Sequence, residues 1–156
     1  MKKWCFLLVI LCLLPSCGRQ HPALQIETAE TRALATYGTD ELHRVDDDFV
    51  RTSFGIPDYV KKASVYFTAN GDGTEIGFFQ LTDAAYAGKM KGVIQDYLNS
   101  ERQAVESLAA LYPGQELERR ISRFEHAVVE AHGTLVFYVL ADDEQREKIL
   151  HALTRA

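Results

Sequence analysis

The sequence predicts an α+β fold, in which a long helix and shorter helices pack on a face of a four-stranded, mainly antiparallel sheet. Three observations support this prediction. Four segments are rich in apolar, β-branched and aromatic residues, and glycine-containing turns join them into two β-hairpins. A long amphipathic stretch separates the hairpins. The length of 156 residues, 47% of them hydrophobic, suits one domain, which we place at residues 27–156, after a signal peptide (1–16) and a tether (17–26).

Two helices are expected before the first hairpin. The first covers residues 27–37 and ends at Gly38, a residue type that is favoured just after a helix. The second is short, follows three aspartates at positions 46–48 and ends at Gly55. Because carboxylates stabilise helix N-termini, we interpret the aspartates as capping residues. A paired acid–base site is the alternative, but the local sequence offers no apolar surroundings for it.

The two hairpins are predicted from pairs of strand-like segments with tight turns between them. The first joins residues 63–68 to 75–81 through Asn70-Gly71-Asp72-Gly73, where the glycines supply positive φ angles. The second joins residues 126–131 to 134–140. The last of these segments is apolar at nearly every position, so we expect it in the centre of the sheet.

Three further helices are expected. Residues 82 to about 111 carry one apolar stripe at helical spacing, and Pro113-Gly114 follows that stretch. Residues 115–124 predict a short helix. Asp142, with Gln145 three residues later, resembles a capping box that opens a C-terminal helix.

The first seventeen residues have the pattern of a bacterial lipoprotein signal. Two lysines precede an apolar run over residues 4–14, which is too short to cross a membrane because a span needs ~20 residues. Leu14-Pro15-Ser16-Cys17 resembles a lipobox, where a diacylglyceryl group is attached to the cysteine sulfur before cleavage between Ser16 and Cys17. We therefore predict lipidation of Cys17. An ordinary secretory signal with a chance cysteine is the alternative.

Cleavage at this position changes the composition of the chain. Cys17 becomes the only cysteine, which excludes a structural disulfide and a cysteine-based metal site. Loss of two lysines leaves 15 basic residues of the original 17 against 22 acidic ones, a formal charge of −7, which disfavours nucleic acid as a partner. Two acyl chains on one cysteine suffice for stable anchoring. We therefore expect the protein on the extracytoplasmic face of the cell membrane, in a Gram-positive bacterium, with the diacylglyceryl group as its membrane contact.

The order of several short motifs is informative beyond each motif alone. The lipobox is followed by Phe54-Gly55-Ile56-Pro57, by Glu75-Ile76 at the start of a strand, and by Tyr112-Pro113 at the end of the long helix. This order resembles the bacterial lipoprotein family known as domain of unknown function 4358, over about residues 34–153. Here Ala69-Asn70-Gly71-Asp72 makes a tighter turn than the longer loop of that family. The resemblance implies an envelope location and an α+β fold, and it carries no site, because the family has no assigned activity.

Two clusters invite a metal-binding interpretation. In the first turn, Asn70, Asp72 and Gly73 match a calcium loop, but Phe79 stands where that loop needs a bidentate glutamate, so we favour a plain hairpin turn. In the second hairpin, even spacing places His126, Glu130 and His132 on one face of a strand. The span of roughly 20 Å is too long for one zinc ion, and only the last two could share a site. We favour a polar strand face.

No catalytic, cofactor-binding or metal site is predicted. The sequence favours a binding or scaffolding module of the cell envelope that recognises an envelope protein or a small ligand. The alternative is an envelope enzyme whose site assembles from residues distant in sequence, such as His43, His126 or the acidic helix start. Five aromatic residues are expected mainly in the core, with an exposed ligand surface as the alternative: Tyr66, Phe67, Phe78, Phe79 and Tyr138.

Overall fold

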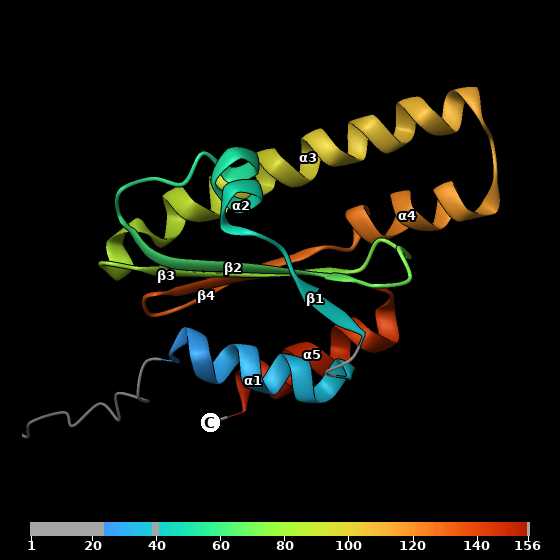
Figure 1. Cartoon of the computed structure of the whole chain (residues 1–156). Coiled ribbons are helices and arrows are strands. Elements are labelled where there is room, and N and C mark those ends of the chain that lie inside the picture. Colours follow the sequence, from blue (N-terminus) through green and yellow to red (C-terminus); the bar gives the residue numbers. More distant parts are fainter. Residues whose placement is uncertain (1–23, 39–40, 156) are drawn as a thin grey trace, which may run out of the picture.

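The computed structural model describes residues 24–38 and 41–155. Its centre is a five-stranded antiparallel sheet in the order β1-β2-β3-β5-β4, with helices on both sides (Figure 1). The predicted α+β class, both hairpins and the long helix are confirmed. One expectation was wrong, because the sheet has five strands rather than four. Helices cover both of its faces, as the apolar segment 134–140 requires.

The first hairpin consists of β2 (Val60–Thr68) and β3 (Glu75–Leu81). Gly71 and Gly73 in the turn have φ angles of 68° and 86°, a conformation that glycine adopts at low cost. Every residue of β3 is buried. A strand that is buried throughout needs cover on both faces of the sheet, and the helices provide it.

The second hairpin consists of β4 (Val128–His132) and β5 (Leu135–Leu140). As predicted, β5 is buried throughout and lies inside the sheet, between β3 and β4. The predicted start of the hairpin at His126 was wrong, because the preceding helix α4 (Gln115–Glu125) runs on and His126 is its C-cap residue.

The fifth strand is β1 (Leu42–Arg44), which pairs with residues 66–68 of β2 at the edge of the sheet. It has three residues, of which only Leu42 is buried. So short a segment shows no alternation of apolar and polar residues, and its strand conformation depends on its pairing with β2.

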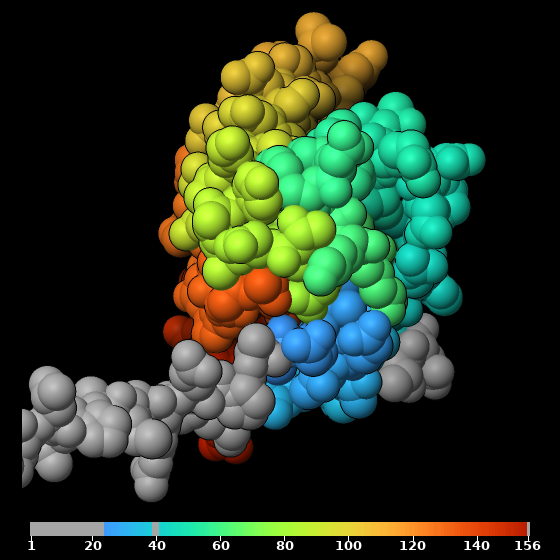
Figure 2. All heavy atoms as spheres, turned by 90° about the vertical axis from the view of Figure 1, so that its left-hand side faces the viewer, coloured from blue at the N-terminus to red at the C-terminus, as the bar shows by residue number. Residues whose placement is uncertain are grey.

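Two helical layers enclose the sheet (Figures 1 and 2). The first and last helices, α1 (Ile26–Tyr37) and α5 (Asp143–Thr154), pack together on one face. In Figure 2 the blue atoms of α1 lie at the lower side of the molecule, away from the yellow atoms of the long helix at the top. The other face carries α2 (Asp47–Phe54) and α3 (Ala87–Leu111), with α4 beside α3. A 3₁₀ turn, η1 (Ala84–Tyr86), leads into α3.

The sheet separates two apolar cores. Ile76, Phe78 and Phe137 belong to the core under α1 and α5, which Ile26 also joins at the start of α1. Alternate residues of the same strands belong to the core under α2 and α3, among them Phe79, Val136 and Tyr138. In the part of the chain that the structure describes, no helix combines the length and the apolar character needed to span a bilayer.

Candidate functional site

The predicted cleavage and lipidation residues, Ser16 and Cys17, lie outside the described residues. The lipid anchor therefore stays a prediction from the sequence.

The turn between β2 and β3 uses its polar side chains to hold its own backbone. Asp72 Oδ1 accepts hydrogen bonds from the Thr68 hydroxyl (2.6 Å) and from the Thr74 N–H (2.8 Å). Partial burial raises the pKa of Asp72, but these hydrogen bonds outweigh it and the net shift is downward. Within residues 24–38 and 41–155, no group of three or more His, Cys, Asp or Glu side chains is placed to hold a metal ion.

The second hairpin does not bring its two histidines together. His126 lies at the end of α4, where ring atom Nδ1 is 2.8 Å from the carbonyl oxygen of Ser122. Glu130 and His132 do meet on β4, with 3.3 Å between Oε2 and Nε2. The expectation that only these two could share a site agrees with this geometry.

The three aspartates stand at the start of α2, as predicted: Asp46 is its N-cap residue, and Asp47 and Asp48 lie in its first turn. Asp46 Oδ1 accepts a hydrogen bond from the Phe49 N–H at 2.7 Å, and Asp47 forms an ion pair with Arg44 at 2.7 Å. The helix ends at Gly55, whose φ angle of 51° is left-handed.

The five aromatic residues considered as a ligand surface divide between the two cores. The core under α1 holds Tyr66 and Phe78, and the core under α2 and α3 holds Phe79 and Tyr138, with Phe67 at its margin. Among the described residues, the exposed large apolar side chains lie elsewhere, at the C-terminal end of α3: Leu108, Leu111 and Tyr112.

The most unusual group in the described chain is a buried carboxyl at the start of β3. Glu75 is only 7% exposed. Its Oε2 accepts a hydrogen bond from the Tyr97 hydroxyl on α3 (3.1 Å), and its Oε1 accepts one from the Tyr138 hydroxyl on β5. Three elements that are distant in sequence therefore meet at one carboxyl group.

Burial raises the pKa of Glu75 to about 7, although hydrogen bonds from Tyr138 and Tyr97 act to lower it; Glu101 contributes a further rise. None of the described residues that shift this pKa is positively charged. Burial and the neighbouring Glu75 charge also raise the pKa of Tyr97 and of Tyr138, so both hydroxyls keep their protons. Glu75 thus has a pKa near neutral pH and no positive partner among the residues that the structure describes.

Glu75 faces a pocket of about 300 Å³, which we call the Glu75 pocket. Aromatic rings form part of its wall: Phe49 and Phe67 meet edge to face with centroids 5.4 Å apart, and Phe124 lines the pocket from α4. Tyr97 and Glu101 of α3 line it as well. The volume is in the range of small-molecule sites, and the lining combines apolar and polar side chains in about equal measure.

Arg120 of α4 closes the pocket next to the turn of the first hairpin. Its Nε atom is buried and has no hydrogen-bond partner in the described structure. The Arg120 side chain lies against Gly73, and a Cβ atom added at position 73 would lie 3.0 Å from Arg120 Nε. A larger residue at position 73 would therefore displace Arg120 from this wall.

The sequence placed Glu75 at the start of a strand, but it did not predict that this carboxyl is buried and hydrogen-bonded to two tyrosines. Two signals were present. Glu75 is the only charged residue in the segment Glu75–Leu81, and Gly77 lies two residues further along the same strand face. These two residues can be interpreted only once the pairing with β5 is known. Gly77 pairs with Tyr138, and because glycine has no side chain, the tyrosine ring has room to reach Glu75.

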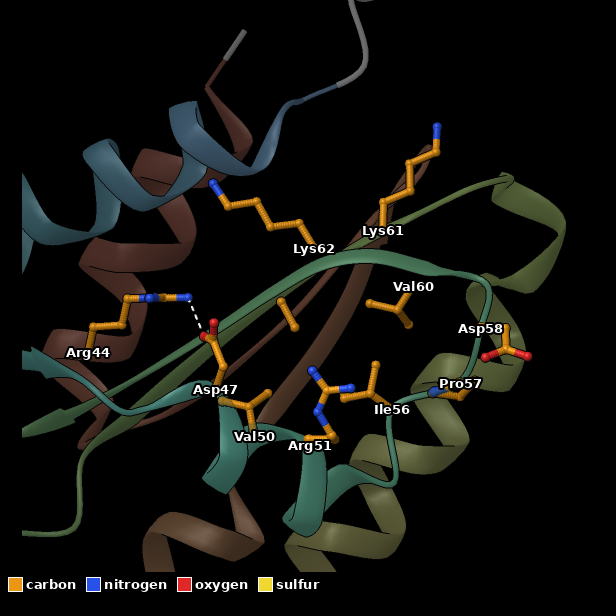
Figure 3. A pocket seen from close by; sticks show the side chains of 11 residues that line it. Arg44, Asp47, Val50, Arg51, Ile56, Pro57, Asp58, Val60, Lys61 and Lys62 are labelled. Atoms are coloured by element: carbon orange, nitrogen blue, oxygen red, sulfur yellow. Dashed lines mark hydrogen bonds and ion pairs between the residues drawn. The ribbon is translucent and has the colours of Figure 1, made fainter.

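A second pocket, of about 520 Å³, lies between α2 and the outer edge of β2 (Figure 3). We call it the basic pocket, because four cationic side chains line it: Arg44, Arg51, Lys61 and Lys62. Arg44 is paired with Asp47, and Lys62 Nζ lies 3.0 Å from a carboxylate oxygen of Glu27. Arg51 and Lys61 form no ion pair with any described residue.

Comparison of the chain with known family models, curated proteins and solved structures finds no match in any of the three. Membership of the lipoprotein family named above stays a prediction.

Proposed function

We propose that this protein is a lipid-anchored binding module on the extracytoplasmic face of the cell membrane, and that it takes a small organic cation in the Glu75 pocket. The anchor rests on the lipobox-like sequence at Cys17. The binding role rests on one observation: Glu75 is a buried carboxyl that faces a pocket and has no cationic partner among the described residues.

The charge of the pocket favours a cation over an anion. Glu75 and Glu101 both line it, and each ionised carboxylate attracts a positive ligand. Arg120 is the one cationic side chain among the lining residues, and it lies at the turn against Gly73. A ligand cation next to Glu75 lowers the pKa of that carboxyl and supplies the ion-pair partner that Glu75 lacks among the described residues.

The aromatic walls support the same ligand class. The faces of phenylalanine and tyrosine rings attract cations, particularly where water is excluded. Phe49, Phe67 and Phe124 form the walls around the carboxyl groups. An ammonium group on an apolar body would therefore contact carboxylates with one end and rings with the other.

Three probes of matched size test the ligand class: phenethylamine, 2-phenylethanol and phenylacetate, which are cationic, neutral and anionic. Titrations followed by calorimetry at pH 8 are expected to rank them in that order of affinity. Binding of the amine should weaken by up to about tenfold per pH unit below about 7, because Glu75 must then release a proton.

Glu75→Gln is the test variant and Glu130→Gln, an exchange on β4 outside this pocket, is its matched control. We expect Glu75→Gln to lose the preference for the amine and the pH dependence, whereas Glu130→Gln keeps both. Equal affinity for the three probes, or tighter binding of phenylacetate through Arg120, would contradict the proposal.

An enzyme is the second candidate, favoured by one observation. Residues 75, 97 and 138 assemble a carboxyl group with a pKa of about 7 beside two tyrosine hydroxyls, and a carboxyl group that titrates near the working pH suits acid–base catalysis. Mass spectrometry of a bound ligand after long incubation separates the two functions. If the protein is a binding module, the ligand is recovered unchanged. If it is an enzyme, the parent converts the ligand to a product and the Glu75→Gln variant does not.

A further inference from the structure

The outer edge of β2 is only partly covered. β1 pairs with residues 66–68, and the Val45 N–H donates to the Val65 carbonyl oxygen at 2.9 Å. Alternate residues of an antiparallel strand direct their backbone groups to opposite sides, and the register with β3 is regular from residue 63 to 67. The N–H and C=O of Ala63 therefore point outward, as those of Val65 do. β1 ends before it reaches Ala63, and neither of these two backbone groups forms a hydrogen bond with any described residue.

The basic pocket lies beside this open edge. Figure 3 shows Arg51 reaching from α2 into the space below β2, and Arg44 at the opposite end, joined to Asp47. Val60 and Ile56 provide an apolar floor between the cations. Two carboxylates, Asp47 and Asp58, line the pocket beside the four cations, so the edge stays net positive. Since the whole chain carries a formal charge of −5, this edge contrasts with the rest of the protein and attracts negative groups.

We infer that the outer edge of β2 binds an extended acidic peptide segment of a partner protein, which joins the sheet as a short strand beside Ala63. Added strands gain affinity from backbone hydrogen bonds and specificity from side-chain contacts. Here the Ala63 backbone supplies the hydrogen bonds, and Arg51 and Lys61 meet carboxylates of the segment. Four residues of β2 extend ~13 Å, which sets the length of the paired segment. This surface is separate from the Glu75 pocket and does not depend on its ligand.

Lysines and a bulge on an edge strand also protect a sheet from pairing with other copies of itself. The register of β2 shifts between Val60 and Lys62, and Lys61 and Lys62 point to the same side (Figure 3), as a bulge requires. These cations repel a second basic edge and attract an acidic segment. Binding of an acidic peptide would therefore show that the edge recognises a partner, and is not only protected against pairing with other copies of the chain.

Fluorescence anisotropy of labelled short peptides, titrated with the full chain in an uncharged detergent, tests the inference. A peptide that alternates Glu and Thr should bind, and more weakly as salt increases. A Lys–Thr peptide has the wrong charge. A Glu–Pro peptide keeps the charge but lacks N–H donors at its prolines and cannot pair as a strand. Both should bind at least about tenfold more weakly.

Two substitutions locate the binding surface. Ala63→Pro removes the outward N–H from an edge position, where proline is tolerated, and Arg51→Gln removes the unpaired guanidinium; each should weaken binding of the Glu–Thr peptide by about tenfold. The control variant is Ala131→Pro on β4, the strand at the opposite edge of the sheet. This variant should bind the peptide as the parent does.

Circular dichroism checks that the proline variants fold. If Ala63→Pro does not fold, Arg51→Gln and the Glu–Pro peptide decide. Equal binding of the Glu–Pro peptide, unchanged binding by Arg51→Gln, or self-association of Lys61→Gln/Lys62→Gln without peptide binding to the parent would overturn the inference.

Discussion

One carboxyl group is expected to make the stability of the fold depend on pH. The pKa of Glu75 is about 7 in the folded protein, against an ordinary value of 4.5. Below pH 4.5 both states hold the proton and the contribution of this group is fully present. As pH rises from 4.5 to about 7, the unfolded chain releases the proton first, so the fold loses about 3 kcal/mol of stability.

Urea unfolding of the parent and of Glu75→Gln between pH 4.5 and 8 measures this loss. Because all other titrating groups are shared, the stability of Glu75→Gln relative to the parent should rise by about 3 kcal/mol over this range. Glu130→Gln, on β4, should follow the parent. Parallel curves for the parent and Glu75→Gln would show that the charge of Glu75 is not buried.

At the scale of the element, the pairing of β3 with β5 depends on a glycine. Gly77 is opposite Tyr138, and a Cβ atom at position 77 would overlap the tyrosine ring. Gly77→Ala should therefore destabilise the protein by about 1–3 kcal/mol, as overpacking of a core does. It should also move the Tyr138 hydroxyl away from Glu75. Thermal and urea unfolding measure the first effect.

Gly92→Ala is the matched control for this substitution. Gly92 lies in α3, is exposed, and has nothing within 4 Å of an added Cβ atom. Because alanine is the better helix former, this variant should gain about 0.5–1 kcal/mol. If both alanine variants were equally stable, the close packing of Tyr138 on Gly77 would be refuted.

Local patterns predicted most elements because their causes are local. The Asp46 side chain caps α2, and Gly38 and Gly55 follow helix ends with positive φ angles. The same reasoning missed β1, whose three residues are held by pairing with β2. It also placed the start of the second hairpin at His126, which the structure assigns to the cap of α4. In both cases tertiary packing decided what the short sequence left ambiguous.

At the scale of the whole molecule, the predicted membrane location depends on one thiol. Cys17→Ala removes the sulfur that would carry the diacylglyceryl group, so the chain should lose acyl label, stay uncleaved after Ser16 and leave the lipid-anchored fraction. Metabolic labelling with a fatty acid, together with the mass of the N-terminal fragment, measures each effect. A neighbouring exchange, Arg19→Gln, leaves the predicted lipobox intact and should behave as the parent. Unchanged labelling of Cys17→Ala would disprove the predicted anchor.

The sequence by itself determined the class of the fold, the order of its helices and hairpins, and the caps and turns that end them. These features follow from periodicity, from capping side chains and from glycine, which act over a few residues. Only the tertiary structure decided which helices cover each face of the sheet, that β1 joins its edge, and that Glu75 meets Tyr97 and Tyr138. Each of these depends on contacts between distant segments and on burial, and burial turns an ordinary strand residue into a carboxyl that titrates near neutral pH.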